Sequence, residues 1–141
     1  PLTRSAVKLC RWSKTHLRGN GACYKHTFYG LNSASCMEAS PSIACANRCL
    51  FCWRHHSNPT GRAWRWKEDS AEEIYNGMIA NQRVAEVEGV MYALVKQFAG
   101  CEGVKKERVD EALQFRHCAL SLVGEPIMYP HIADFIDLLH Q

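Results

Sequence analysis

Three cysteines within eight residues constrain this 141-residue chain more than any other feature of its sequence. Cys45, Cys49 and Cys52 form a C-x3-C-x2-C loop after residues 41–44, which we predict to be a short strand. Three thiolates at this spacing can each bind one iron of a [4Fe-4S] cluster and leave the fourth iron open to a chelating small molecule. Zinc, with four ligands and commonly paired C-x2-C knuckles, is the alternative, because His55 or His56 can complete a Cys3His site.

A second set of cysteines has a different spacing. Cys10, Cys23 and Cys36 are separated by twelve residues each time. Three scattered thiols would explain this spacing, but residues 1–40 show no sustained helical or strand period, so we predict an irregular extension shaped by a metal. A second cluster there would need three such thiolates. Eight cysteines without a secretion signal favour metal binding over disulfides.

The remaining two cysteines lie outside both sets. Cys118 falls in an apolar run, so we predict that it is buried like a small hydrophobic residue. Cys101 lies between two glycines, and we assign it no role.

Charge is divided sharply along the chain. Residues 1–67 hold eleven Lys or Arg and a single acid, whereas residues 68–141 hold six Lys or Arg and thirteen acids. A basic half favours a polyanionic partner, although a solvated basic face is the simpler alternative. Aromatic residues that can stack on unpaired bases are interleaved with these charges and favour nucleic acid: Trp12, Tyr24, Phe28, Tyr29, Trp53, Trp64 and Trp66.

The second half of the chain predicts alternating helices and a strand. Ser70 and Glu73 form a capping box, and an apolar helical pattern runs on towards Phe98, with Gly77 and Gly89 as the points where it would break. Further elements are a helix at 105–115 that buries Val109, Ala112 and Leu113, a buried parallel strand at 117–123, and a helix opened by Pro130. The order strand, helix, strand, helix predicts a parallel α/β arrangement.

The central loop, with Phe51 directly before its last cysteine, resembles the signature of the radical S-adenosylmethionine (SAM) superfamily. The resemblance implies that Cys45, Cys49 and Cys52 hold a [4Fe-4S] cluster whose open iron chelates SAM. One electron then cleaves SAM to a 5′-deoxyadenosyl radical. The backbone near Phe51 would lie beside the adenine, and the turn Gly124-Glu125-Pro126 would contact the SAM amino group.

The two cysteine sets together resemble the tRNA 4-demethylwyosine synthase family in particular. The matching segments span essentially the whole chain: residues 8–12, 17–19, 23–30, 36–38, 52–56, 64–67 and 122–130. The fold implied is the N-terminal part of a partial (β/α)6 barrel at residues 41–141, truncated after about two strand–helix units. Residues 1–40 would be the extension that binds the second cluster through Cys10, Cys23 and Cys36.

The resemblance implies a radical SAM lyase of wybutosine biosynthesis. Such enzymes condense pyruvate with N1-methylguanosine of phenylalanine tRNA to form 4-demethylwyosine. Lys25 matches the lysine that forms a Schiff base with pyruvate, and an amine near a bound keto acid is placed to attack its carbonyl. Arg11, Arg18, Arg54 and Arg65 are candidates for tRNA phosphate contacts.

Several expectations accompany this interpretation. The chain has no membrane-spanning apolar run, so we expect a soluble cytoplasmic protein. It begins with Pro, so we expect upstream sequence to be missing, and we expect a truncated segment to be weakly active or inactive by itself. The electron donor would be a flavodoxin-like domain or protein, and any FMN would lie in such an upstream domain. The alternatives are a zinc-binding, non-enzymatic RNA module, another two-cluster radical SAM enzyme such as a methylthiotransferase, and a degenerate paralogue.

Overall fold

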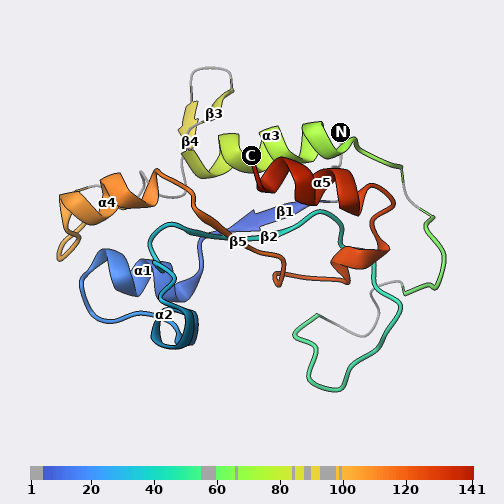
Figure 1. Ribbon diagram of the computed structural model, residues 1–141, viewed down its shortest axis with the longest axis horizontal. Coiled ribbons are helices and arrows are strands. Elements are labelled where there is room, and N and C mark those ends of the chain that lie inside the picture. Colours follow the sequence, from blue (N-terminus) through green and yellow to red (C-terminus); the bar gives the residue numbers. More distant parts are fainter. Residues whose placement is uncertain are drawn as a thin grey trace.

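A computed structural model of the chain describes residues 5–54, 60–65, 67–83, 85–87, 90–92, 98 and 100–141. No helix among these residues is long and apolar enough to cross a membrane. Figure 1 shows α3 and α5 on one side of a small sheet, and α1, α2 and the cysteine loop (residues 45–52) on the other. The elements in chain order are β1 (Ala6–Lys8), α1 (Arg11–Leu17), α2 (Tyr24–Tyr29), β2 (Cys36–Ser40), α3 (Ala71–Arg83), β3 (Ala85–Val87), β4 (Val90–Tyr92), α4 (Lys106–Ala112), β5 (His117–Ala119), the 3-10 turn η2 (Pro126–Met128) and α5 (Ile132–Leu139).

β2 is the central strand of a three-stranded sheet with the order β1-β2-β5. β1 pairs with it antiparallel, with Val7 opposite Ala39, and β5 pairs with it parallel, with Met37 opposite Cys118. Successive side chains of a strand point to opposite faces of the sheet, so Met37 and Ala39 share one face and Cys36 lies on the other. The parallel pair β2 and β5, with α3 between them in sequence, confirms the predicted α/β arrangement.

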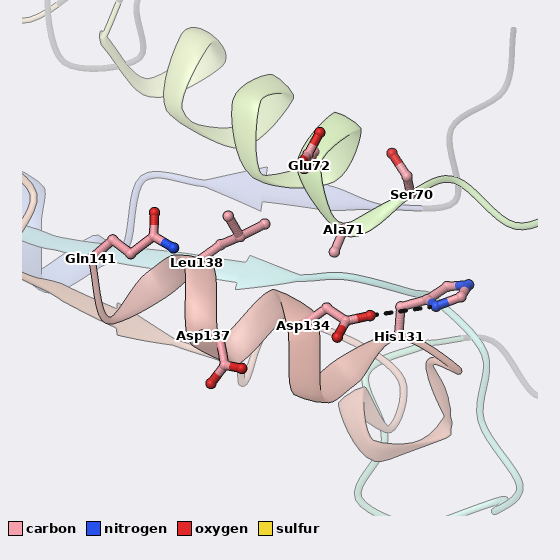
Figure 2. Close-up of a pocket in the computed structure, with 8 residues that line it drawn as sticks. All are labelled: Ser70, Ala71, Glu72, His131, Asp134, Asp137, Leu138 and Gln141. Atoms are coloured by element: carbon pink, nitrogen blue, oxygen red, sulfur yellow. Dashed lines mark ion pairs between the residues drawn. The ribbon is translucent and has the colours of Figure 1, made fainter.

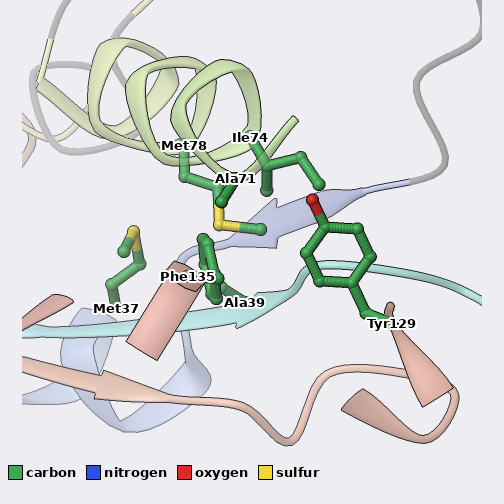
Figure 3. Close-up of a cluster of buried hydrophobic side chains, with 7 residues drawn as sticks. All are labelled: Met37, Ala39, Ala71, Ile74, Met78, Tyr129 and Phe135. Carbon is green, nitrogen blue, oxygen red and sulfur yellow. The ribbon is translucent and has the colours of Figure 1, made fainter. Parts of the chain in front are cut away.

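Helices α3 and α5 cover one face of the sheet through a compact apolar core (Figure 3). Phe135 of α5 is completely buried, and the Tyr129 ring meets it edge-on at a centroid distance of 6.5 Å. The Tyr129 hydroxyl donates a hydrogen bond of 2.6 Å to the Asp69 carbonyl, which ties the approach to α5 to the start of α3. The cluster comprises Met37, Ala39, Ala71, Ile74, Met78, Tyr129 and Phe135.

A smaller apolar cluster joins α1 to α4. Leu9, Leu17 and Ala34 pack there against Val109 and Ala112 of α4. The predicted burial of Val109 and Ala112 is confirmed, although α4 is shorter than the predicted helix at 105–115. This contact fixes α1, which directly follows Cys10, against α4.

The first 40 residues are more regular than predicted. They contain β1, α1, α2 and β2, and the strand expected at 41–44 is instead β2, at 36–40. Two helices of seven and six residues are too short to show a helical period in the sequence. β2 escaped notice because Cys-Met-Glu-Ala-Ser contains none of the β-branched or aromatic residues that mark strands.

The predicted helix start at Ser70 is confirmed, but the predicted helix end is wrong. The Ser70 backbone N–H donates to the Glu73 carboxylate at 2.9 Å, and the Glu73 N–H donates to the Ser70 hydroxyl at 3.2 Å. α3 ends at Arg83, and the antiparallel pair β3 and β4 follows where the helix was expected to run on to Phe98. Apolar and charged residues alternate in Ala85-Glu86-Val87, and this is the period of a strand rather than of a helix. Residues 84, 88–89, 93–97 and 99 lie outside the described part of the chain.

The last predicted strand and helix are also shorter than expected. β5 ends at Ala119 rather than at Val123, and beyond that point the Ser40 side chain holds Val123. The Ser40 hydroxyl donates to the Val123 carbonyl at 2.6 Å and accepts the Val123 N–H at 2.8 Å. α5 begins at Ile132, two residues after Pro130.

The core makes a direct prediction for Phe135. Phe135→Ala removes a fully buried ring from the contact between α5 and the sheet, so we expect the free energy of unfolding to fall by about 3–5 kcal/mol. Ile136→Ala is the matched control on the same helix, because Ile136 is 38% exposed. Urea unfolding of both variants measures the difference. Equal losses for the two variants would show that this core does not hold α5.

Candidate functional site

The cysteines of the N-terminal set each mark the start of a structural element. Cys10 directly precedes α1, Cys23 directly precedes α2, and Cys36 is the first residue of β2. Cys23 and Cys36 are buried and Cys10 is half-buried. The segment is therefore built so that each thiol is fixed by the backbone of a different element.

Hydrogen bonds join the segments that carry these three thiols. The Ser13 hydroxyl, three residues after Cys10, lies 2.7 Å from the Ser33 carbonyl and 3.5 Å from the Cys36 carbonyl, and the Ser33 hydroxyl accepts the Cys23 N–H at 3.1 Å. Burial raises the pKa of the Cys36 thiol, the Lys25 ammonium opposes that rise, and the charges of Cys23 and Cys10 add to it. We call Cys10, Cys23, Cys36 and Lys25 the N-terminal thiol site.

Cys23 has the most favourable surroundings for a thiolate in this site. Burial by itself raises the pKa of the Cys23 thiol. A hydrogen bond from the Ser33 hydroxyl, backbone N–H groups of His26 and Lys25, and the Lys25 charge outweigh burial, so the pKa falls below its usual value. Hydrogen bonds to the charged form of a group favour that form.

Lys25 is the cation shared by these thiols. It is half-buried in the first turn of α2, and its Nζ lies 5.8 Å from the centre of the Tyr24 ring. Its charge also acts on Cys118, whose pKa is raised to about 12, first by burial and then by the Cys36 thiolate. Cys118 packs against the core, but it is half-buried rather than buried as predicted, because β5 is an edge strand of the sheet. Such a high pKa keeps it a neutral thiol.

The cysteine loop lies beyond the other end of β2. Cys45 is buried, while Cys49 and Cys52 are half-buried, and the Cys52 N–H donates to the Cys49 carbonyl at 3.0 Å. The loop is closed from outside by the Gly61 N–H, which donates to the Cys45 carbonyl at 3.0 Å. Phe51 is 91% exposed, so its ring is free to meet a ligand or another part of a protein.

The turn Gly124-Glu125-Pro126 lies directly against the entrance of this loop. The Glu125 N–H donates to the Ala44 carbonyl at 2.8 Å, and the Cys45 thiol lies 3.9 Å from the Glu125 carboxylate. Gly124 has a φ of +72°, and a Cβ there would lie only 2.5 Å from the Ala44 carbonyl oxygen. The structure therefore brings Cys45, Gly124 and Glu125 together.

Asn47 completes this contact and was missed in the sequence. Its side-chain amide donates to the Glu125 carboxylate, which joins the middle of the cysteine loop to the turn. Nothing in the spacing of the cysteines marks Asn47. The one sequence feature that could have indicated Asn47 is its position inside the cysteine loop, which must keep a single conformation.

The donor chemistry of both sets fits iron–sulfur clusters. All eight cysteines are free thiols. Among the described residues, no three His, Cys, Asp or Glu side chains are gathered as ligands of one metal ion, whereas the thiolates of a cubane cluster bind separate irons. The alternative zinc ligands His55 and His56 lie outside the described part of the chain.

Arg54 places a buried donor beside the cysteine loop. One guanidinium nitrogen, Nη1, donates to the Ile43 carbonyl at 2.9 Å. Its Nε is buried and has no hydrogen-bond partner among the described residues. Buried donors are seldom left unpaired, so this nitrogen is suited to an acceptor that binds at the loop.

The candidate tRNA contacts differ in how freely they are presented. Arg11 and Arg65 are exposed, whereas the Arg18 guanidinium lies over the Phe98 ring at 5.7 Å and Arg54 is engaged with Ile43. Trp66 lies outside the described residues, and Trp64 is half-buried beside Tyr129. The remaining aromatic candidates are all exposed: Trp12, Tyr24, Phe28, Tyr29 and Trp53.

A separate pocket between the start of α3 and α5 is a poor match for an iron–sulfur cluster or a nucleic acid (Figure 2). Its volume is about 420 Å³, and it contains no cysteine. His131 pairs there with Asp134 at 3.7 Å, and Glu72 and Asp137 also line it. Its carboxylates would repel a polyanion, so the cysteine segments form the candidate site.

Comparison with known proteins agrees with this assignment. No family model matches the chain. It is 57% identical over 139 residues to the S-adenosyl-L-methionine-dependent tRNA 4-demethylwyosine synthase TYW1 of Homo sapiens, a match that covers 99% of this chain and 18% of that protein. The corresponding synthase of Schizosaccharomyces pombe is 51% identical over 99% of this chain and 19% of its own length. This chain belongs to the tRNA 4-demethylwyosine synthase family.

Solved structures of this family have the same fold. The structure of TYW1 with a lysine-pyruvate adduct bound is 31% identical in sequence and has a TM-score of 0.76. The match covers 97% of this chain and 42% of that one. A crystal structure of archaeal TYW1 is 27% identical, with a TM-score of 0.72 and coverages of 99% and 43%. The chain thus spans about a fifth of the length of the curated synthases. Its described strands form an open, mixed sheet rather than a closed barrel.

The close approach at Gly124 predicts an unusually large effect of one methyl group. Gly124→Ala would place a Cβ against the Ala44 and Ser42 carbonyls, so we expect a loss in unfolding free energy well above the roughly 1 kcal/mol of left-handed backbone strain. Gly103→Ala is the control, because Gly103 has a similar φ of +76° but no atom of the described residues within 4 Å of the added methyl group. Urea unfolding compares them, and equal losses would mean that the turn does not pack on the loop as described.

Proposed function

We propose that this chain carries the two cluster-binding sites of a tRNA 4-demethylwyosine synthase. The reaction is the condensation of N1-methylguanosine of phenylalanine tRNA with pyruvate, as a step of wybutosine biosynthesis. The observation that carries the proposal is the set of hydrogen bonds through Ser13 and Ser33 that joins the segments of Cys10, Cys23 and Cys36, with Lys25 two residues after Cys23. A relative with the same fold is known with a lysine-pyruvate adduct bound.

The cysteine loop is the proposed SAM site. Cys45, Cys49 and Cys52 would hold a [4Fe-4S] cluster, in the N-terminal portion of a radical SAM domain formed by residues 41–141. When bound, this cluster and SAM supply the radical that removes hydrogen from the N-methyl group. The exposed Phe51 would flank the adenine, and Gly124-Glu125-Pro126, at the mouth of the loop, would contact the SAM amino group.

The N-terminal thiol site is the proposed pyruvate site. Its three cysteines would hold a second [4Fe-4S] cluster within residues 1–40. Lys25, once deprotonated, would attack the keto carbon of pyruvate, and loss of water would leave a Schiff base. Lys25 is half-buried and lies two residues after Cys23, so a small keto acid held at this site would lie within reach of its amine.

The basic half of the chain is the proposed tRNA face. Arg11 and Arg65 are exposed and available for phosphates, and the exposed aromatics of α2, together with Trp53 directly after the cysteine loop, can stack on unpaired bases. The electron would come from a flavodoxin-like domain or protein, and FMN would be bound there.

Substitution of Lys25 tests the function. We expect the full-length protein to form 4-demethylwyosine on N1-methylguanosine-containing tRNA only with pyruvate, and borohydride to trap labelled pyruvate on the protein. Lys25→Arg keeps the positive charge beside the thiols but removes the nucleophilic amine, so trapping and product should both disappear. Mass spectrometry of the labelled peptide locates the adduct.

Lys8→Ala is the matched control for this experiment. Lys8 is an exposed lysine two residues before Cys10, as Lys25 lies two residues after Cys23. We expect this variant to trap pyruvate and form product like the wild type. Undiminished trapping by the Lys25→Arg variant would remove Lys25 from the mechanism, and product formation without pyruvate would refute the proposed reaction.

A further inference from the structure

Two buried serines connect the three segments that carry the N-terminal cysteines. Ser13 and Ser33 are 1% and 2% exposed. The Ser13 hydroxyl, in α1 and three residues after Cys10, lies 2.7 Å from the Ser33 carbonyl and 3.5 Å from the Cys36 carbonyl. Ser13 therefore links α1 both to the loop before β2 and to the first residue of β2.

Ser33 makes two contacts with a single cysteine. Its hydroxyl oxygen accepts the Cys23 backbone N–H at 3.1 Å, and its hydroxyl proton is donated to the Cys23 Sγ at 3.4 Å. Because the Ser33 oxygen already accepts the Cys23 backbone N–H, the Ser33 hydroxyl proton is left to be donated to the Cys23 sulfur. The group is buried, so water does not compete for it.

No other buried serine in the described part of the chain contacts a thiol in this way. The Ser35 hydroxyl donates to the Glu111 carbonyl at 3.2 Å, and the Ser40 hydroxyl is engaged with the Val123 backbone. The Ser42 hydroxyl accepts the Ala44 N–H. The contact of Ser33 with Cys23 is thus specific to the N-terminal thiol site.

We propose that Ser33 is a positioning residue for the second cluster: its hydroxyl aims the Cys23 sulfur at the cluster and raises the cluster's reduction potential, while Ser13 holds the cysteine segments in place. The inference rests on the proposed two-cluster function. A hydrogen bond to a ligating sulfur withdraws negative charge and favours the reduced cluster, and such bonds are among the features that set these potentials. Loss of a partner that orients a metal ligand typically weakens metal binding 10- to 100-fold.

The test compares Ser33→Ala with Ser35→Ala in the full-length protein carrying both clusters. We expect Ser33→Ala to shift the midpoint potential of the second cluster to a more negative value in an EPR-monitored redox titration. We also expect a chelator to remove that cluster's iron about tenfold faster. The first cluster should keep its potential. Ser35→Ala removes an equally buried hydroxyl two residues away and should leave both clusters like the wild type.

The outcomes separate the role of Ser33 from the function on which it rests. A second-cluster potential in Ser33→Ala that matches Ser35→Ala overturns the proposal, and so does equal destabilisation of both clusters. If Ser33→Ala does not fold, Ser13→Ala takes its place, because this variant keeps the Ser33 hydroxyl. Faster iron loss from the second cluster at an unchanged potential supports the proposal. Unchanged iron loss overturns the proposal. Wild-type protein with a single cluster overturns the two-cluster function itself.

Discussion

The alternation of side chains along β2 is the constraint on which the rest of the structure depends. Met37 and Ala39 point into the core beneath α3 and α5, so Cys36 points to the opposite face. A slip of one residue in the pairing with β1 and β5 would exchange these faces and bury the Cys36 thiol in the apolar core. Packing of the helices and placement of the Cys36 thiol are therefore two consequences of one register.

The same strand sets the relation between the two cysteine sites. Cys36 stands at its first residue, and the cysteine loop begins five residues after its last, so the sites are separated by a strand roughly 15 Å long. At the far end, Ser40 and Gly124 hold the chain after β5 against the chain after β2. This places Glu125 at the entrance of the cysteine loop. The proposed SAM site and the proposed pyruvate site would thus have a fixed scaffold between them.

The sequence predicted the family and some short-range features of the fold. The capping box at Ser70 and the buried positions Val109 and Ala112 of α4 are short-range patterns, and both are confirmed. The register of β2 depends on partners distant in the chain, so no local period reveals it. The two short helices and the three-residue strands β3 and β4 are too short to show a period of their own. Ser33 and Asn47 were missed because their roles arise only when Cys23 and Glu125 are brought to them by the fold. The roles of the cysteines and Lys25 stay predictions.

The central claim, two separate clusters on one chain, is tested most directly by counting iron. The full-length protein would be reconstituted anaerobically and its iron and sulfide measured in the wild type and in two triple variants, Cys45→Ala/Cys49→Ala/Cys52→Ala and Cys10→Ala/Cys23→Ala/Cys36→Ala. Two sites predict about eight irons in the wild type and about four in each variant. Iron lost only when Cys45, Cys49 and Cys52 are replaced would contradict a cluster at the N-terminal thiol site. Zinc in place of iron would contradict the proposal that the protein is a radical SAM enzyme.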